Sequence, residues 1–419
     1  MVSLTDPRRA AETTSGARQS SLRASNLSLV ARTVCASAEP ISRAGVAKRT
    51  SMTRSTASRL ADDLVAAGLL DELERAGTTG PGRPATPLVA GGGVAALGLQ
   101  VNAGFLAARV VSLRGDVIGE HIEVDDLVGS PPVPTLGRLA AIARDVLDGM
   151  PSGVRLVGGG LALPGVVSTD TGTLLLAPNL GWADLRPVEH LPGDLLPAGA
   201  GVLRVGNEAD LAARTVAEET PGRPGPVRDF VYLSGEIGIG GAVVLDGRVM
   251  TGQHGWAGEI GHVTVDPDGP ACPCGSTGCL ERYAGRHAIL DAAGMDRDST
   301  AADIATAAAS GDARATEALG RAARALGIAV AGVLNVLDIP AVVLGGHLGQ
   351  IADLLRPGLE RQLRTRVMSA RWAAPTIVPA PVDLAPGATG AAMLELSLVL
   401  DQPALWADHR TSQGASTLR

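Results

Sequence analysis

Residues 258–281 read GEIGHVTVDPDGPACPCGSTGCLE and contain the pattern that decides the fold. Three of the four cysteines in the chain lie here at C-x-C-x4-C spacing, Cys272, Cys274 and Cys279, and His262 precedes them. Three thiolates and one imidazole fill a tetrahedral shell with no open position, which predicts a structural zinc site. A disulfide is unexpected in a cytoplasmic chain, and buried free thiols are the other alternative.

The composition of the chain sets its class. The 419 residues are 45% hydrophobic but only 2% aromatic, so Ala, Leu and Val must fill the cores of two or three domains. This composition excludes collagen, long disorder and coiled coils. The most apolar stretch, 325–346, is interrupted by Asn335, Asp338 and Pro340, which predicts a buried helix and then a buried strand, not a membrane span. The amino terminus has no apolar signal segment, so we expect a cytoplasmic protein without a membrane partner.

Charge is distributed unevenly along the chain. The net charge is −7, yet residues 1–60 hold ten Lys and Arg against three Asp and Glu, while the remainder holds 26 basic against 40 acidic residues. A basic head on an acidic body predicts that only the head meets a polyanion. The alternative is a charged disordered tail, which we expect for the polar, unpatterned residues 1–20.

The remainder of the head has the pattern of a DNA reader. Helices are expected over 26–38, in a short segment after Pro40, and over 53–67, followed by strands on both sides of the turn 77–84. A short helix, a tight turn at 50–52 and a helix with a polar amino end fit a major groove, and an Arg between Gly and Pro fits a minor groove. An ordinary three-helix bundle is the alternative. The residues expected at DNA are Ser42, Arg43, Lys48, Arg49, Thr53, Arg54, Ser55, Thr56, Ser58, Arg59 and Arg83.

Beyond a glycine junction at 91–93 the pattern changes to α/β. Buried-strand and helix patterns alternate from there to about residue 400. Strands are expected at 94–101, 106–113, 117–124, 155–162, 230–234, 241–245 and 341–345, and helices at 135–149, between 300 and 338, and at 388–400. Cys35 is expected to be a core residue of the first helix.

The strings GEIGH (258–262) and CPCGSTGCLE (272–281) together resemble the signature of the ROK family of repressors, open reading frames and kinases. SRAGVAK (42–48), the helix from Thr53 and GRP (82–84) resemble the winged helix-turn-helix of its repressor branch. The resemblance implies an α/β chain in which this head precedes a two-lobed, actin-like (ribonuclease H-like) sugar-kinase fold, with zinc organising the sugar site. The implied division is a disordered tail (1–20), a winged helix-turn-helix domain (21–90), a sugar-binding domain (94–400) with lobe 1 at about 94–205 plus 380–400 and lobe 2 at about 206–379, and a flexible tail (401–419).

The resemblance also places the sugar contacts. A ring of carboxylate, amide and imidazole groups can satisfy the donors and acceptors of several hydroxyls. His262 can bind zinc through one nitrogen and a hydroxyl through the other. For Glu259 and Glu281 a supporting role around zinc is the alternative. The implied sugar-binding residues are Asn179, Asn207, Glu208, Glu259, His262 and Glu281.

The same resemblance argues against kinase activity. The kinases of the family carry Asp-x-Gly-Gly-Thr where this chain has the segment from Gln100 to Gly104, so the acid and the hydroxyl are lost. Their catalytic Asp is replaced by Glu208, whose extra methylene displaces the carboxylate, and a misplacement of about 1 Å can cost ~100-fold in rate. Glu236 places an acid in the second glycine-rich loop, 235–241, where it would repel a triphosphate. We therefore expect that the chain is not an enzyme.

These observations favour a sugar-responsive transcriptional regulator. We expect it to be a repressor of carbohydrate genes. Its partners would be operator DNA and a sugar inducer, and a homodimer or homotetramer would read a palindrome. Two alternatives stay open. One is an active ATP-dependent sugar kinase with an appended DNA-binding head, and the other is a constitutive DNA-binding regulator with a vestigial sugar site.

Overall fold

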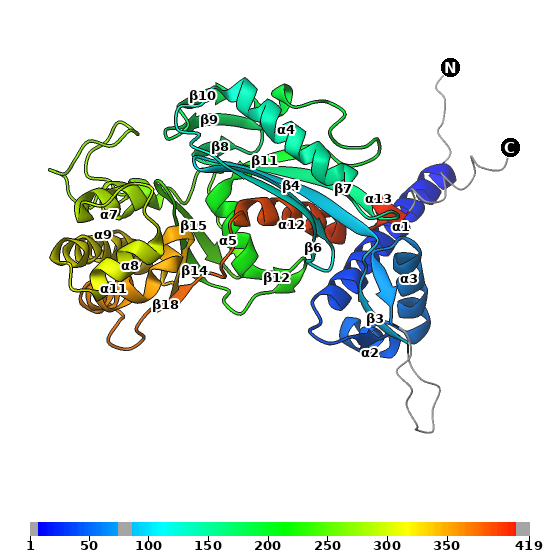
Figure 1. Ribbon diagram of the computed structural model, residues 1–419. Helices are drawn as coiled ribbons and strands as arrows, with labels where there is room; N and C mark the ends of the chain where they lie inside the picture. The colour runs from blue at the N-terminus through cyan, green and yellow to red at the C-terminus, as the bar shows by residue number, and fades with distance from the viewer. Residues whose placement is uncertain (1–6, 74–85, 408–419) are drawn as a thin grey trace, which may run out of the picture.

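The described part of the head contains three helices and three strands. The computed structural model describes residues 7–73 and 86–407. Helices α1 (Pro7–Cys35), α2 (Arg43–Thr50) and α3 (Arg54–Ala66) pack together. The antiparallel sheet β1-β3-β2 (Ile41–Ser42, Pro87–Ala90 and Leu70–Glu72) lies beside them (Figure 1). The turn expected over 77–84, including Arg83, lies outside the described residues.

Helix α1 differs from the prediction at both ends. It begins at Pro7 and ends at Cys35, so residues 7–20 are helical where a disordered tail was expected, and the helix stops three residues before the expected 38. Ala10, Ala11 and Glu12 have strong intrinsic helix propensity, which the lack of an apolar stripe conceals. At the other end, the Ser37 hydroxyl donates to the Glu39 carbonyl at 2.7 Å, and such local side-chain bonds compete with helical backbone.

Helices α2 and α3 begin where the sequence predicts. The Ser42 hydroxyl accepts a hydrogen bond from the Gly45 N–H at 3.1 Å, and the Thr53 hydroxyl accepts one from the Thr56 N–H at 3.2 Å. These side chains satisfy backbone donors that have no partner inside the helix. Ser51 ends α2 in the left-handed conformation, which produces the tight turn toward α3.

The body contains two five-stranded sheets with the same topology. In each, a meander of three antiparallel strands is followed by two parallel strands added on the other side. The first sheet, in the order β6-β5-β4-β7-β11, comprises Val117–Val124, Phe105–Ser112, Val94–Asn102, Arg155–Leu163 and Leu203–Asn207. The second, in the order β16-β15-β14-β17-β18, comprises Arg248–Val249, Ile239–Leu245, Phe230–Gly235, Ala341–Gly345 and Thr376–Pro379.

Helices cover both sheets (Figure 1). On the first, α4 (Pro132–Asp148) covers one face and α12 (Pro386–Asp401) covers the other, and α5 (Glu208–Ala217) packs between α12 and the second sheet. A Cβ on Gly98 of β4 would lie 1.8 Å from the Ala388 carbonyl oxygen, so only glycine lets α12 approach this closely. The second sheet packs with α6 (Glu281–Ala284), α7 (Arg286–Ala293), α8 (Ala301–Ala309), α9 (Ala313–Leu337), α10 (Gly346–Gln350) and α11 (Ala352–Arg366).

The smaller elements lie between and around the lobes. A three-stranded sheet, β8 to β10, adjoins the first lobe, and short pieces connect the major elements. These are β8 (Val166–Ser168), β9 (Thr173–Ala177), β10 (Trp182–Leu185), η1 (Pro187–His190), β12 (Glu218–Thr220), β13 (Arg223–Pro224), η2 (Ile260–His262) and α13 (Ala404–Ala407).

Helix α9 is the predicted buried helix, and the buried strand β17 follows it. By length and composition α9 could cross a membrane, but 56% of its most apolar stretch is buried inside the protein. It packs against α7 and α11, and its Ala and Leu side chains form the core of the second lobe. The helix therefore behaves as a core helix.

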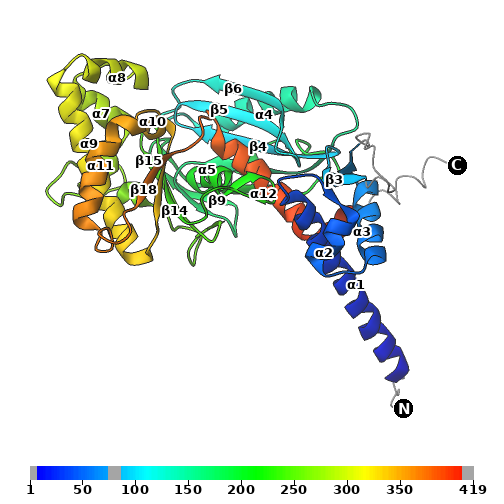
Figure 2. The same cartoon turned by 90° about the horizontal axis from the view of Figure 1, so that it is seen from below.

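The head and the body share one hydrophobic core. Leu27, Val30 and Val34 of α1 belong to the same buried cluster as Leu396 and Leu400 of α12. Figure 2 shows α12 running from the middle of the molecule to α1. Head and body are thus packed together across the short glycine junction.

The carboxyl-terminal segment 401–407, expected in a flexible tail, is part of this fold. Asp401 accepts hydrogen bonds from the Arg32 guanidinium, and the Arg155 guanidinium lies 5.5 Å from the centre of the Trp406 ring. Trp406 also packs against the shared core. The polar sequence after the last periodic residue conceals these long-range contacts.

Candidate functional site

The two lobes meet at a narrow cavity of about 60 Å³. Its wall is built by the amino end of α5, the β9–β10 turn, the glycine-rich loop between β14 and β15, and the segment from η2 to α6. All the side chains expected to contact a sugar line this one cavity, namely Asn179, Asn207, Glu208, Glu259, His262 and Glu281.

Asn207 is fixed by its position as the N-cap of α5. Its Oδ1 accepts hydrogen bonds from the backbone N–H groups of Ala209 (2.7 Å) and Asp210 (3.1 Å), and its Nδ2 donates to the Gly165 carbonyl at 2.9 Å. The amide has one N–H left to offer. Capping therefore orients Asn207 before any ligand arrives.

Glu208 is held by two amides of strand β4. Its Oε2 accepts hydrogen bonds from Gln100 Nε2 at 3.1 Å and from Asn102 Nδ2 at 2.9 Å. Burial raises the pKa of Glu208, and the two amide bonds act against that rise. Gln100 in turn accepts a hydrogen bond from the Ala388 N–H at 3.0 Å. The sequence pattern did not reveal that these β4 side chains bind Glu208, although residues 100 and 102 share a strand face.

A further carboxyl group beside the cavity was not predicted. Asp210, on the first turn of α5, has a buried oxygen without a hydrogen-bond partner among the described residues. Burial, and then the negative charge of Glu259, raise the pKa of Asp210 to about 7. The Asn-Glu-Ala-Asp string could have identified it, because residue 210 lies one turn from the N-cap.

Glu236 lies in the glycine-rich loop and is half-buried against the second lobe. A Cβ on Gly346 would lie 2.3 Å from its Oε1, so the carboxyl group packs onto the Gly346 backbone. Burial first, and then the charge of Glu208, raise the pKa of Glu236 to about 7, with Arg286 acting in the opposite direction.

The raised pKa of Glu236 predicts how the free energy of unfolding depends on pH. In the pH window from its ordinary value of 4.5 to about 7, the folded state retains a proton that the unfolded state has lost, so Glu236 destabilises the fold as pH rises. We expect Glu236→Gln to gain ~3 kcal/mol of unfolding free energy relative to the wild type between pH 4.5 and pH 8. Denaturant unfolding at both pH values measures this, and Glu317→Gln, on an exposed position of α9, is the control. A constant difference across pH would contradict the prediction.

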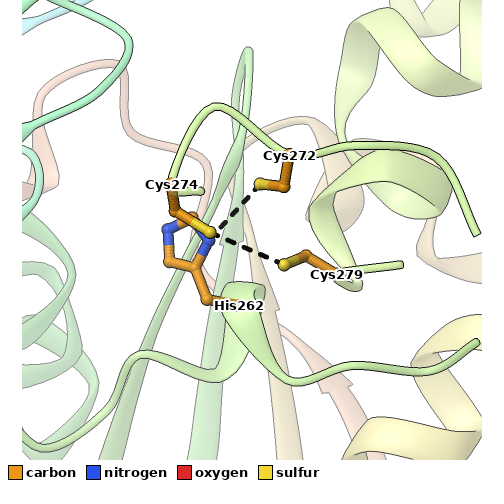
Figure 3. A group of neighbouring side chains, drawn as sticks. All are labelled: His262, Cys272, Cys274 and Cys279. Atoms are coloured by element: carbon orange, nitrogen blue, oxygen red, sulfur yellow. Dashed lines mark hydrogen bonds between the residues drawn. The ribbon is translucent and has the colours of Figure 1, made fainter. Parts of the chain in front are cut away.

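Beside the cavity, His262 and three cysteines converge from two segments of one loop (Figure 3). Their ligand atoms all lie within 4.8 Å of one another. Cys274 Sγ is 3.7 Å from Cys279 Sγ, and Cys272 Sγ is 3.8 Å from His262 Nδ1. These separations match the edge of about 3.8 Å of a tetrahedron with metal–sulfur bonds of ~2.3 Å, and they exceed the ~2.05 Å of a disulfide. The cluster could therefore hold a metal ion.

The cluster also shapes the cavity. His262 directs Nδ1 toward the thiols, while its Nε2 lies 4.0 Å from the Glu259 carboxylate. Glu281 connects the two regions, because its Oε1 lies 3.9 Å from Cys272 Sγ and its Oε2 accepts from the Ile239 N–H at 3.3 Å. The remaining cysteine, Cys35, is buried in the shared core as expected.

Of the residues expected at DNA, some make contacts within the head and some are exposed, and Arg49 and Thr53 do both. Arg43 forms ion pairs with Asp62 and Glu72, and Arg49 donates to the Ser37 hydroxyl at 3.1 Å. The pairs of Arg43 hold it within the head, which local sequence did not reveal. Ser42 and Thr53 are helix caps, and Thr56 and Ser58 are half-buried. The exposed side chains are Lys48, Arg49, Thr53, Arg54, Ser55 and Arg59.

Comparison with known proteins places the chain in a family. A model described as the ROK family matches residues 135–397. A putative xylose repressor of Caldicellulosiruptor sp. (strain Rt8B.4) is 30% identical, covering 79% of this chain and 86% of its own. A glucokinase of Halalkalibacterium halodurans is 35% identical over 48% of this chain and 65% of its own. The crystal structure of a ROK-family transcriptional regulator, titled a homologue of the E. coli MLC protein, superposes with a TM-score of 0.73 at 24% identity and covers 92% of this chain and 99% of its own. This chain belongs to the ROK family.

Proposed function

We propose that the chain is a sugar-responsive transcriptional repressor of the repressor branch of the ROK family. The observation that carries this proposal is that the hydroxyl-binding cavity and the basic head lie at opposite ends of one helix, α12. A relative named a xylose repressor, similar along most of its length, supports the same function. Such a protein acts in the cytoplasm, where its operator lies.

The cavity is suited to a sugar ring. Three amides, four carboxyl groups, one hydroxyl and one imidazole line the cavity and supply both donors and acceptors, which is what several hydroxyls need. Because the metal cluster lies next to the cavity, we assign it a structural zinc ion held by His262, Cys272, Cys274 and Cys279. When bound, the ion would fix the loop and the tautomer of the imidazole. His262 then presents its Nε2–H to the cavity.

The head is assigned as a winged helix-turn-helix over residues 21–90, ahead of a sugar-binding body over 94–400. Its α2–turn–α3 segment exposes Lys48, Arg54 and Arg59, which can neutralise phosphates or reach base edges. A two-fold dimer would place two such heads on half-sites about one helical turn, ~34 Å, apart.

Three features favour a receptor over a kinase. Two amide donors engage Glu208 Oε2, so only Oε1 is left to meet a hydroxyl. Its side chain is one methylene longer than the expected Asp. Glu236 fills the space against Gly346 with an acid, where a phosphate would be repelled. The glucokinase relative is the observation that favours the alternative of a sugar kinase.

Contacts along α12 offer a route between the two sites. At its amino end, Gln100 joins the Ala388 N–H to the Glu208 carboxylate. At its carboxyl end, the Leu400 carbonyl accepts from the Ser28 hydroxyl at 2.8 Å, and Asp401 pairs with Arg32. A sugar that hydrogen-bonds to Glu208 would change the hydrogen bond between Glu208 and Gln100. It would thereby shift the position of α12 relative to α1.

Loss of the distal contact should therefore weaken the coupling. We expect Arg32→Ala to reduce by about 5-fold the factor by which the inducing sugar lowers operator affinity, because the head no longer follows α12. The factor is the ratio of operator Kd values with and without sugar. Arg23→Ala is the matched control, since Arg23 lies on the same helix but pairs with Asp63 inside the head. An equal coupling factor in both variants would exclude this route.

One experiment separates the three functions. Operator sequences are selected with the full chain from random DNA, and glucose, xylose and N-acetylglucosamine are each tested for binding and for release of that DNA, with and without ATP. A sugar that binds, releases DNA and is not phosphorylated is the expected result. Phosphorylation that Glu208→Ala abolishes would establish the kinase instead, and DNA binding that no sugar changes would establish the constitutive regulator.

A further inference from the structure

A second, larger cavity adjoins the sugar cavity. Its volume is about 450 Å³, and it shares Asn179, Ile237 and Glu281 with the first. Its outer wall is formed by α6, α7 and α9 together with the loop 262–279, which carries the candidate metal ligands. The volume therefore continues outward from the Glu281 side of the sugar cavity.

Two polar side chains, Asn179 and Glu281, line both cavities where the cavities adjoin. A Cβ on Gly238 would lie 1.9 Å from Glu281 Oε2 and 2.9 Å from Asn179 Nδ2, so both groups pack onto the bare glycine backbone. The missing side chain at 238 lets the carboxylate and the amide meet there. A ligand passing from one cavity to the other would meet an acceptor and a donor at this point.

The outer cavity has a mixed, hydroxyl-binding character. Arg297 forms a bidentate pair with Asp291, at 3.0 and 2.7 Å, and this pair neutralises both charges. Burial, and then the nearby Arg297, lower the pKa of His287, so at neutral pH its ring offers one donor and one acceptor. The side chains of Arg282 and Arg321 are exposed and make no hydrogen bond or ion pair with the described part of the chain.

This chemistry differs from that of a phosphate site. Carboxylates at 281 and 291 line the wall together with the arginines, so it offers acceptors as well as donors, whereas a phosphate needs donors alone. Hydroxyl groups, in contrast, bind guanidinium donors and carboxylate acceptors equally well. A monosaccharide in the inner cavity would leave the outer one filled with water.

We propose that the outer cavity is a second glycosyl subsite, so that the effector of this chain is a disaccharide or a larger glycoside. The inference rests on the proposed sugar sensing and extends it to the size of the ligand. One sugar ring lies among Asn207, Glu208 and His262. The next lies against Arg282, His287 and Arg321, with the glycosidic linkage passing between Asn179 and Glu281.

Matched pairs of sugars test this subsite on the full chain. Calorimetry compares glucose with maltose and cellobiose, xylose with xylobiose, and N-acetylglucosamine with chitobiose. We expect at least one disaccharide to bind about 10-fold more tightly than its monosaccharide, which corresponds to one added hydrogen bond to a charged group. Arg321→Ala should remove most of that gain without changing the Kd of the monosaccharide.

The control and the other outcomes make the result decisive. Arg324 lies three residues further along α9, is exposed and does not line the cavity. Arg324→Ala should therefore keep the gain in disaccharide affinity. If monosaccharides bind as tightly as every disaccharide, or if a sugar phosphate is preferred over its disaccharide, the second subsite is wrong while the sugar sensor stands. If no sugar of either size binds, the proposed sugar sensing fails, and the subsite with it. Melting temperatures of both variants verify that they are folded.

Discussion

Replacing Cys274 by serine is expected to release the metal ion and to weaken sugar binding by about 100-fold. A hydroxyl is a far poorer zinc ligand than a thiolate, so one missing sulfur opens the tetrahedral shell. The loop between His262 and Glu281 then loses the ion that ties its ends, and both side chains leave the positions in which they face the cavity. Metal analysis of the purified protein and calorimetry with the inducing sugar measure the two effects.

The control for this prediction is another cysteine. Cys35→Ala removes a buried thiol from the core shared by head and body, far from the metal loop in the sequence, and should retain one equivalent of zinc. A chelator should reproduce the Cys274→Ser phenotype in the wild-type protein, and added zinc should reverse it. If the serine variant retains one equivalent of metal, the assigned ligand set is wrong.

The double variant Arg54→Ala and Arg59→Ala is expected to weaken operator binding by about 100-fold. Both guanidinium groups are exposed on α3 and are without an ion pair among the described residues. We expect each guanidinium to contribute about 10-fold to operator affinity through phosphate or base contacts. The slope of log affinity against log salt concentration should become shallower by ~0.9 for each phosphate contact that is lost. Fluorescence anisotropy with the selected operator over 50–200 mM salt measures both quantities.

Arg43→Ala is the matched control in the same head. Because Asp62 and Glu72 hold Arg43, its loss should lower stability but leave the salt dependence of binding unchanged. Sugar binding should be normal in both variants. A double variant with wild-type affinity and salt slope would show that DNA is read elsewhere.

Local features of this protein were predictable from the sequence. The starts of α2 and α3, the turn between them, and the buried pair α9 and β17 were all predicted within a few residues of their bounds. Capping, turn formation and side-chain periodicity depend on residues within about four positions of each other, so they can be read from a short window. The loop 258–281 spans more positions, and its ligand set was predictable because four side chains of metal-binding type lie within one segment.

Partners that are distant in sequence were settled only by the tertiary structure. The topology repeated in the two lobes leaves no short-period repeat in the sequence, and Gln100 binds Glu208 across 108 positions. Ser28 reaches the Leu400 carbonyl across 372 positions, which joins the head to the body. Such a contact depends on how sheets and helices stack. The residues next to Arg43 in the sequence do not select which of many possible distant partners it binds. The sequence therefore determined which groups the protein has, and packing decided which of them meet.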